Sequence, residues 1–163
     1  MDTFAHGFWS WLIYHKRKWV WWAVLFGVLP DLLSFGVYIV YNIITGNFVP
    51  GRPRLEAIPN YVHVSYNITH SLVVFAAIFL LIYLLTKKWY WPFTAWALHS
   101  VIDLPTHTTR FFPTPILWPI SSFAFDGISW GSSWFMALNY FAIILVFFIV
   151  RFNNKKAKNK KSK

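Results

Sequence analysis

The chain has 163 residues, of which 57% are hydrophobic, 22% aromatic and only 12% charged. A soluble globular domain carries about 25% charged residues, so this composition excludes that class and indicates a membrane protein with several helices. The net charge of +10 does not indicate nucleic-acid binding, because seven of the fifteen Lys and Arg lie in residues 151–163 without aromatic interleaving, and the absence of cysteine excludes disulfides and thiolate metal sites.

Apolar runs in the sequence predict helices, because they lack the period-2 alternation of a small membrane barrel. The first run, residues 4–15, is too short to cross a bilayer, so we expect either a half-spanning helix paired with the next one or a helix lying flat at the interface. The remaining runs cover residues 19–45, 70–86, 89–104 and 133–150. The predicted fold is all-α: a polytopic membrane helical bundle of about four spanning helices with a short N-terminal half-spanning or re-entrant helix, forming one domain of residues 1–150.

The basic residues predict the orientation of these helices. Placing the clusters at residues 16–18 and 87–88 and the basic tail in the cytoplasm leaves three of the fifteen Lys and Arg outside, namely Arg52, Arg54 and Arg110. Residues 46–64 and 105–132 then form outward-facing loops. Residues 151–163 are expected to be a disordered cytoplasmic tail near anionic lipid, and no signal peptide is expected, because the first apolar run precedes its basic cluster.

Ionisable residues within the apolar runs predict a functional site, because a charge at bilayer depth is costly unless it is paired. His6 and Asp31 lie eleven and thirteen residues from the first basic cluster, which places both roughly 16–20 Å above it if the two helices form a hairpin. The same rise of ~1.5 Å per residue places His99 and Asp103 roughly 16–23 Å above the second cluster, with His70 only slightly higher. We therefore expect these side chains to meet in the outer half of the bilayer, with His6 beside Asp31.

Two of these positions carry further local signals. His99 and Asp103 are four residues apart, so they share a helix face that ends near Pro105, which is a suitable arrangement for two metal ligands. Asp31 follows Pro30, which should kink the helix and free the carbonyl of Phe26. A carboxylate is a costly way to solvate a kink, so we interpret Asp31 as a ligand as well.

The segment around His70 is expected to open the second long helix, with Asn67 or Thr69 as its cap. Free N–H groups at such a helix start favour an anion such as a phosphate, so Thr69 and Ser71 are candidate substrate-binding residues. His70 is interpreted as a ligand. His107 lies just past the end of the third long run and is either a ligand or structural.

The order of these elements resembles one protein family. Residues 1–6 (Met-Asp-Thr-Phe-Ala-His), 29–31 (Leu-Pro-Asp), 69–71 (Thr-His-Ser) and 99–103 (His-Ser-Val-Ile-Asp) are similar to the ordered motifs of the bacterial and archaeal YdjM-type (LexA-regulated) membrane-bound metal-dependent hydrolases. The resemblance covers nearly the whole chain. It implies a multi-pass protein of a bacterial or archaeal cell membrane, with the C-terminus in the cytoplasm and a hydrolytic activity that depends on a metal.

The chain departs from the family pattern at one place. The family usually has His-Arg before the Thr-His-Ser element, where this chain has Ser65 and Tyr66. If that histidine is a ligand in relatives, this chain either manages with fewer ligands or recruits His63. The set of histidines and aspartates also resembles the metal site of zinc-dependent phospholipase C, as an analogy of site rather than of fold.

These observations lead to the hypothesis of a metal-dependent hydrolase. The expected catalytic residues are Asp31, His70, His99 and Asp103, and the expected metal ligands are these four with His6, and with His63 and His107 in reserve. Mixed imidazole and carboxylate ligands suit one or two ions of zinc first, or of manganese or iron. The expected substrate is a membrane lipid or lipid-linked phosphoester, with an acyl ester still open, and its phosphate is expected to contact Arg52, Arg54 or Arg110.

Two other classes of function fit the same residues. A small transporter or ion-conducting protein also uses intramembrane Asp and His, although four or so helices are few for a transporter and the sequence has no inverted repeat. A catalytically inactive structural member of the hydrolase family is the other alternative, and the Ser65-Tyr66 departure favours it.

Overall fold

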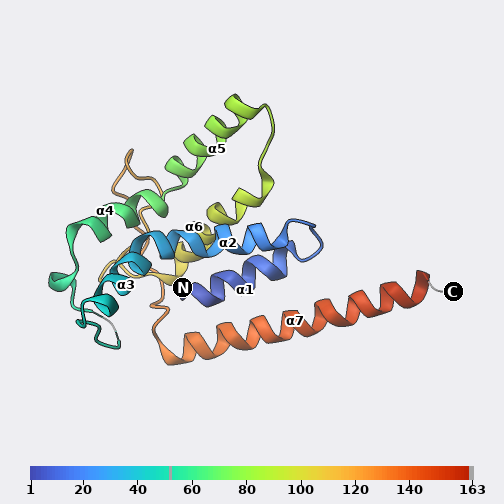
Figure 1. Ribbon diagram of the computed structural model, residues 1–163. Coiled ribbons are helices and arrows are strands. Elements are labelled where there is room, and N and C mark those ends of the chain that lie inside the picture. Colours follow the sequence, from blue (N-terminus) through green and yellow to red (C-terminus); the bar gives the residue numbers. More distant parts are fainter. Residues whose placement is uncertain (52, 162–163) are drawn as a thin grey trace.

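The computed structural model describes the backbone of residues 1–51 and 53–161 and the side chains of residues 1–51 and 53–156. Every regular element in these ranges is a helix, and an isolated antiparallel bridge joins Thr108 to Phe111. The prediction of an all-α protein is therefore confirmed. The helices gather around the N-terminus, which lies near the centre of the molecule beside α6 (Figure 1).

Helices α1 (Thr3–Tyr14) and α2 (Val20–Asp31) form an antiparallel hairpin around the first basic cluster. Asp2 caps α1 by accepting a hydrogen bond from the N–H of Ala5 at 3.0 Å. Close packing of the pair requires Gly27, because a Cβ there would lie 2.9 Å from the Cβ of Ser10. Of the two sequence alternatives for the first segment, the structure has the hairpin, in which a half-spanning helix is packed against the next one (Figure 1).

The first long span continues from α2 through a π-helical turn (Leu32–Gly36) into α3 (Val37–Ile44). The turn follows Pro30, which has no N–H to donate, and the hydroxyl of Ser34 donates to the Pro30 carbonyl at 2.8 Å. The three pieces together form a candidate membrane span of 25 residues, Val20–Ile44. The break expected near Pro30 is therefore present as a wider turn, and π-helical turns are frequent at functional sites.

Helices α4 (Asn60–Thr69) and α5 (Leu72–Thr86) meet at a bend of 60°. The cap of α5 is Ser71, whose hydroxyl accepts from the N–H groups of Val73 and Val74. Two expectations were wrong here: the outward loop was expected to reach residue 64, and the cap was expected at Asn67 or Thr69. Because α4 is much less apolar than α5, the sequence of residues 60–69 did not signal a membrane helix.

Helix α6 (Thr94–Thr106) follows a short 3₁₀ turn (Trp91–Phe93), and α7 (Ser133–Lys161) ends the described chain. By length and hydropathy two helices qualify as membrane spans, or three if α4 and α5 form one bent span. The expected number of about four is therefore too high. The expected span at residues 89–104 corresponds to α6, whose 13 residues are fewer than the about 20 that cross a bilayer.

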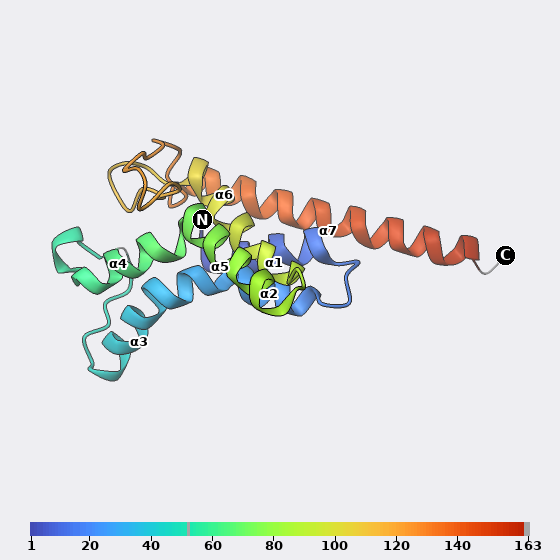
Figure 2. The same cartoon turned by 90° about the horizontal axis from the view of Figure 1, so that it is seen from above.

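The last helix extends into the basic tail. Residues 151–161 continue α7 as helix, so the expected boundary between a helical domain and a disordered tail at residue 150 does not coincide with a helix end. Residues 162–163, which were part of that prediction, lie outside the described residues. The C-terminal half of α7 extends past the rest of the molecule in both views (Figures 1 and 2).

The loop between α6 and α7 is fastened to the end of α6. Backbone N–H groups of Gly127, Ile128 and Trp130 donate to the carbonyls of His107, Pro105 and Thr106 at 2.8–2.9 Å. These bonds use carbonyls that the helix end would leave without partners. Asp126 accepts from the backbone N–H and the hydroxyl of Thr109, and these hydrogen bonds hold the pKa of its carboxyl below the usual range. The loop is thereby held over the outer end of α6.

Candidate metal centre

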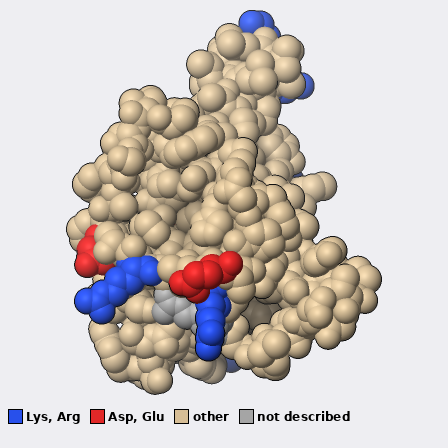
Figure 3. All heavy atoms as spheres, turned by 90° about the vertical axis from the view of Figure 1, so that its left-hand side faces the viewer, with Lys and Arg blue, Asp and Glu red and all other residues tan. Residues whose placement is uncertain are grey.

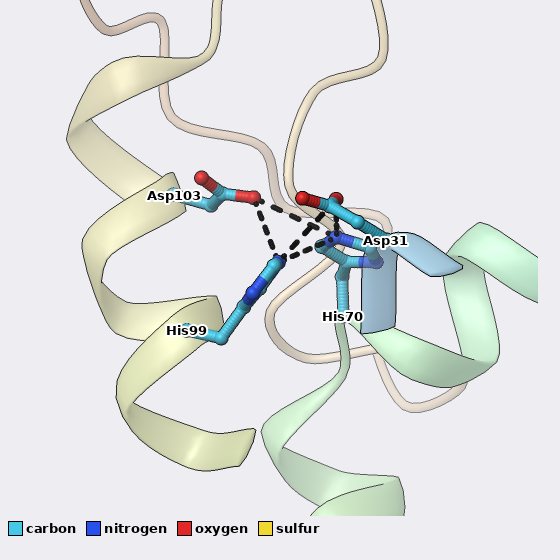
Figure 4. A group of neighbouring side chains, drawn as sticks. All are labelled: Asp31, His70, His99 and Asp103. Carbon is cyan, nitrogen blue, oxygen red and sulfur yellow. Dashed lines mark hydrogen bonds and ion pairs between the residues drawn. The ribbon is translucent and has the colours of Figure 1, made fainter. Parts of the chain in front are cut away.

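Four ionisable side chains from three segments converge beneath this loop (Figure 4). Asp31 comes from the end of α2, His70 from the bend between α4 and α5, and His99 and Asp103 from successive turns of α6. One donor atom from each lies within 4.8 Å of the others. The side chains of His70, His99 and Asp103 are fully buried, whereas that of Asp31 is 14% exposed.

Backbone carbonyls fix the orientation of the two imidazoles. The Nδ1 of His99 lies 2.7 Å from the carbonyl oxygen of Gly27, and the Nδ1 of His70 lies 3.1 Å from that of Tyr66. A carbonyl only accepts, so each Nδ1 carries the hydrogen and each Nε2 has a free lone pair. These two Nε2 atoms face each other at 3.0 Å. Two lone pairs this close repel unless a cation or a proton lies between them.

The two carboxylates complete the group. Asp103 Oδ2 lies 3.3 Å from His99 Nε2 and 3.6 Å from His70 Nε2. Asp31 Oδ1 lies 3.6 Å and 3.5 Å from the same two nitrogens. Ligand bonds of about 2.0–2.2 Å place two ligands of a tetrahedral ion about 3.3–3.6 Å apart. The four carboxylate–imidazole separations therefore match a tetrahedral site, although the two Nε2 atoms are closer, at 3.0 Å. The mixture of imidazole and carboxylate suits zinc, manganese or iron.

Asp103 has different surroundings at each oxygen. Oδ1 accepts from the Met1 amino group and from His6 Nε2, the latter at 2.9 Å. Oδ2, which points at the imidazoles, is buried without a hydrogen-bond partner. Buried polar atoms are normally hydrogen-bonded, and an exception calls for an explanation such as an ion. The outer oxygen thus holds the carboxylate in place while the inner one remains free to bind a cation.

His6 was expected beside Asp31 as a metal ligand, and the hairpin does bring it into the cluster. The only described hydrogen bond of its side chain goes to Asp103, and its ring stacks on that of His99 with centroids 3.6 Å apart. Asp31 instead accepts a hydrogen bond at 2.8 Å from Thr3, which lies on α1 with His6. His6 therefore lies outside the four converging donors and orients two of them.

His107 also contacts the cluster from its outer side. Its Nδ1 lies 2.8 Å from the carbonyl of Phe112, so its Nε2 carries the lone pair, which accepts from the Met1 amino group at 3.1 Å and lies 3.5 Å from Asp103 Oδ2. Tyr66 stacks on His70 with centroids 3.8 Å apart, and its hydroxyl donates to the same Phe112 carbonyl at 3.1 Å. Phe112 adopts a left-handed backbone, with φ of 46°, which is rare for a bulky residue. This strained turn aims one carbonyl at both His107 and Tyr66.

Sequence reasoning missed two of these contributors. Tyr66 was noted only as a departure from a family pattern, and its ring and carbonyl both contact His70. Gly27 acts through its carbonyl, and no side chain marks such an acceptor in a sequence. A signal for Tyr66 existed, because it precedes His70 by four residues and so lies one helical turn away from it.

The remaining sequence candidates lie apart from the cluster. His63 and Arg110 line a separate outer cavity of about 360 Å³, and Tyr66 and Phe112 form its wall toward the cluster. Thr69 is the exception, because its buried hydroxyl lies 3.0 Å from Nδ1 of His70 and also donates to the carbonyl of Tyr66. Ser71 caps α5 and so has a structural role. Arg54 is exposed, and Arg52 lies outside the described residues.

A larger cavity, of about 610 Å³, adjoins the cluster at Asp31. We call it the outer cavity of Asp31. Its polar lining includes Thr3, Asp31 and His107, and its apolar lining includes Phe35, Ile39, Phe111, Phe112 and Trp130. Of the four converging donors, Asp31 alone lines this cavity, and the other three are fully buried.

Comparison with known proteins adds no assignment, since no protein-family model, curated protein or solved structure matches the chain. The observations above support a helical protein with two or three candidate membrane spans and a buried His/Asp cluster suited to a metal ion.

Proposed function

We propose that the chain is a membrane-embedded metal-dependent hydrolase that acts on a lipid or lipid-linked phosphoester at the outer half of the bilayer. The observation that carries the proposal is the spacing of the four converging donors. Five distances between their imidazole and carboxylate atoms fall between 3.0 and 3.6 Å. A divalent cation between the two Nε2 atoms would remove the repulsion of the facing lone pairs of His70 and His99.

Accessibility supports catalysis over a purely structural ion. Structural zinc sites are closed, whereas catalytic ions keep a position that substrate can reach or expand to five ligands. Asp31 is the only one of the four donors that lines the outer cavity described above. Substrate entering that cavity therefore meets the cluster at Asp31.

The chain's own residues hold this arrangement in place. The carbonyls of Gly27 and Tyr66 fix the two imidazoles, His6 fixes Asp103, and Thr3 fixes Asp31. Such supporting hydrogen bonds keep ligands oriented and increase the basicity of imidazole. A bound divalent ion supplies the Lewis acid for the ester oxygen and activates the attacking water. The apolar walls exclude bulk water from the cluster, which strengthens every charge interaction inside.

The expected depth of the cluster in the membrane supports a membrane-borne substrate. The cluster lies at the end of α6 that adjoins the outward-facing loops in the predicted orientation, and α2 and α3 around it expose large apolar side chains such as those of Leu32, Leu33 and Val40. A water-soluble substrate would not need a site within such surroundings. A phosphoester suits a divalent ion with hard oxygen and nitrogen ligands, and an acyl ester is the alternative within the same class of reaction.

The transport alternative requires passages to both sides of the membrane. The lining of the two described cavities contains no residue of the basic clusters at residues 16–18 and 87–88. Their lining comes from the predicted outward loops, from the first residues of the chain and from nearby helix positions, including Phe35 and Ile39 of the long span. This distribution favours a site entered from one side.

The proposal is tested with purified protein in lipid nanodiscs, stripped by a chelator and reloaded with Zn²⁺, Mn²⁺ or Fe²⁺. We expect release of phosphate or headgroup from a panel of phospholipids and lipid-linked phosphates, dependent on metal. His99→Ala should lower turnover at least a hundredfold. His15→Ala is the matched control, because His15 lies outside the cluster and contacts the carbonyl of Leu12.

Three results contradict the proposal. If metal binds but no ester is hydrolysed, the ion is structural or in transit. If His99→Ala retains full turnover, the four converging donors are not the catalytic site. If the wild type neither binds metal nor hydrolyses any ester, the inactive alternative takes its place.

A further inference from the structure

The outer cavity of Asp31 has two chemically different ends. At one end, Asp31, Thr3 and His107 present carboxylate, hydroxyl and imidazole groups beside the four converging donors. The rest of the lining is mainly apolar and aromatic and includes Phe35 and Ile39. A cavity with this division fits an amphiphile whose polar group is at the cluster and whose apolar part contacts the aromatic walls.

The long span itself provides much of the apolar wall. Asp31, Phe35 and Ile39 are spaced four residues apart, so they follow one face of the helix over about 12 Å. Phe111, Phe112 and Trp130 of the outward loop line the same cavity. The hydrogen bonds of residues 127–130 to the end of α6 hold this loop in position, so the cavity is formed before any ligand enters.

The volume of the cavity limits what can enter. A methylene group takes about as much room as a water molecule in the liquid, roughly 30 Å³, so the cavity of about 610 Å³ holds roughly 20 groups of that size. One chain of moderate length with a phosphate fits this volume. Two full-length acyl chains of a phospholipid exceed it.

From this shape and volume we infer that the substrate is a lipid phosphoester, of which a single apolar chain lies in the outer cavity of Asp31 while its phosphate contacts the cluster. The inference rests on the proposed function for the reaction, and it adds the place of that chain. A two-chain lipid would leave its second chain outside the cavity and gain nothing from it.

Alkyl phosphates test this inference by binding alone. Butyl, hexyl and octyl phosphate are titrated calorimetrically into metal-loaded protein in nanodiscs, with empty nanodiscs as the blank for partitioning. The dissociation constant should fall about threefold to fourfold for each added methylene, because each buried CH₂ contributes that factor. A dissociation constant that does not change with chain length overturns the inference.

Cavity-filling variants locate the chain. Ile39→Trp should raise the dissociation constant of octyl phosphate at least tenfold and leave that of butyl phosphate unchanged. Ile44→Trp is the matched control, because Ile44 lies on the same helix but outside the cavity lining and is 79% exposed. Equal affinities in the two variants would place the chain elsewhere, and the wild-type series decides the question if Ile39→Trp is unfolded.

The two proposals fail in different ways. Chain-dependent binding without hydrolysis of any phosphoester contradicts the proposed function and supports the cavity inference. Hydrolysis of phosphoesters with no dependence on chain length supports the proposed function and overturns the cavity inference.

Discussion

Asp103 contributes both of its oxygens to the site, and each has a separate role. One oxygen accepts from His6 and from the Met1 amino group, which fixes the carboxylate. The other faces two imidazole nitrogens and has no hydrogen-bond partner. The Met1 amino group balances the charge at the first oxygen, and a bound cation would give the second oxygen the partner that it lacks.

Asp103→Asn tests this division of roles. The amide oxygen keeps the hydrogen bond to His6, and the negative charge that requires a cation is lost. We expect the metal-free variant to be less stable than the metal-free wild type, because the buried Met1 amino group loses the charge of its carboxylate partner. Saturating metal, at about 1,000 times its dissociation constant, should stabilise the wild type by about 4 kcal/mol and the variant far less. Thermal unfolding with and without metal measures both effects, and equal metal stabilisation of the two proteins would exclude Asp103 as a ligand.

How much of the site could be predicted from the sequence depended on the kind of group. Asp31, His70, His99 and Asp103 could be singled out because ionisable side chains are conspicuous within apolar runs, and counting helical rise from the basic clusters placed them at one level. The role of His6 could not be separated from theirs, since ring orientation decides which atom it contacts. The backbone acceptors of Gly27 and Tyr66 have no sequence signature at all.

At the level of elements, the α1–α2 hairpin positions the cluster. Small residues let the two helices approach closely: a Cβ at Gly7 would lie 3.1 Å from Val28, and one at Gly27 would lie 2.9 Å from the Cβ of Ser10. The approach aligns the carbonyl of Gly27 with His99 and the hydroxyl of Thr3 with Asp31. Helix packing and ligand orientation are therefore coupled.

Gly27→Ala should disrupt both at once. The new Cβ would lie 2.9 Å from the Cβ of Ser10 and 3.5 Å from the carbonyl oxygen of His6, so the helices must separate. We expect a loss of about 1–3 kcal/mol in the free energy of unfolding, together with weaker metal binding. Gly36→Ala is the matched control, because its nearest neighbours lie at 3.5 Å and leave room for a methyl group. Equal stabilities and metal affinities of the two variants would disprove this coupling.

The elements that the sequence did not predict share a physical reason. Residues 60–69 form α4, but their polarity gave no membrane-helix signal, and tertiary contacts with the π-helical turn and α2 supply what hydropathy does not. Helix α6 has the predicted place and end but is too short to be a full span, since its burial among other helices removes the need to cover the whole hydrocarbon thickness. Helix α7 continues into the tail, where Lys and Ala are good helix formers. The prediction of a disordered tail was based on its charge and did not consider this propensity.

For the molecule as a whole, the distribution of charge defines two different ends. Figure 3 shows the end of the molecule where α3, α4 and the outward loops lie; its charged side chains gather in one band, and most of the rest of this face is uncharged. The basic clusters and most of the tail belong to the other end of the candidate spans. The positive-inside rule predicts that the cluster lies in the outer half of the membrane.

Reporter fusions test this orientation. A reporter at Lys163 should be active in the cytoplasm, and one inserted beside Arg54 should be active outside, because twelve of the fifteen Lys and Arg then lie on the cytoplasmic side. A fusion after Lys88 provides an internal check and should report the cytoplasm. The reverse pattern would move the cluster to the inner half and remove the outer-leaflet substrate from the proposal.

The metal content of the purified protein tests the central claim most directly. Wild type and Asp103→Asn are expressed with Zn, Mn and Fe in the medium, purified without chelator and analysed for metal and for protein by elemental and amino-acid analysis. The four converging donors predict at least one equivalent of a divalent metal per wild-type chain and less than a tenth of that in the variant. Wild-type protein that is folded, supplied with these metals and still free of them would contradict the account.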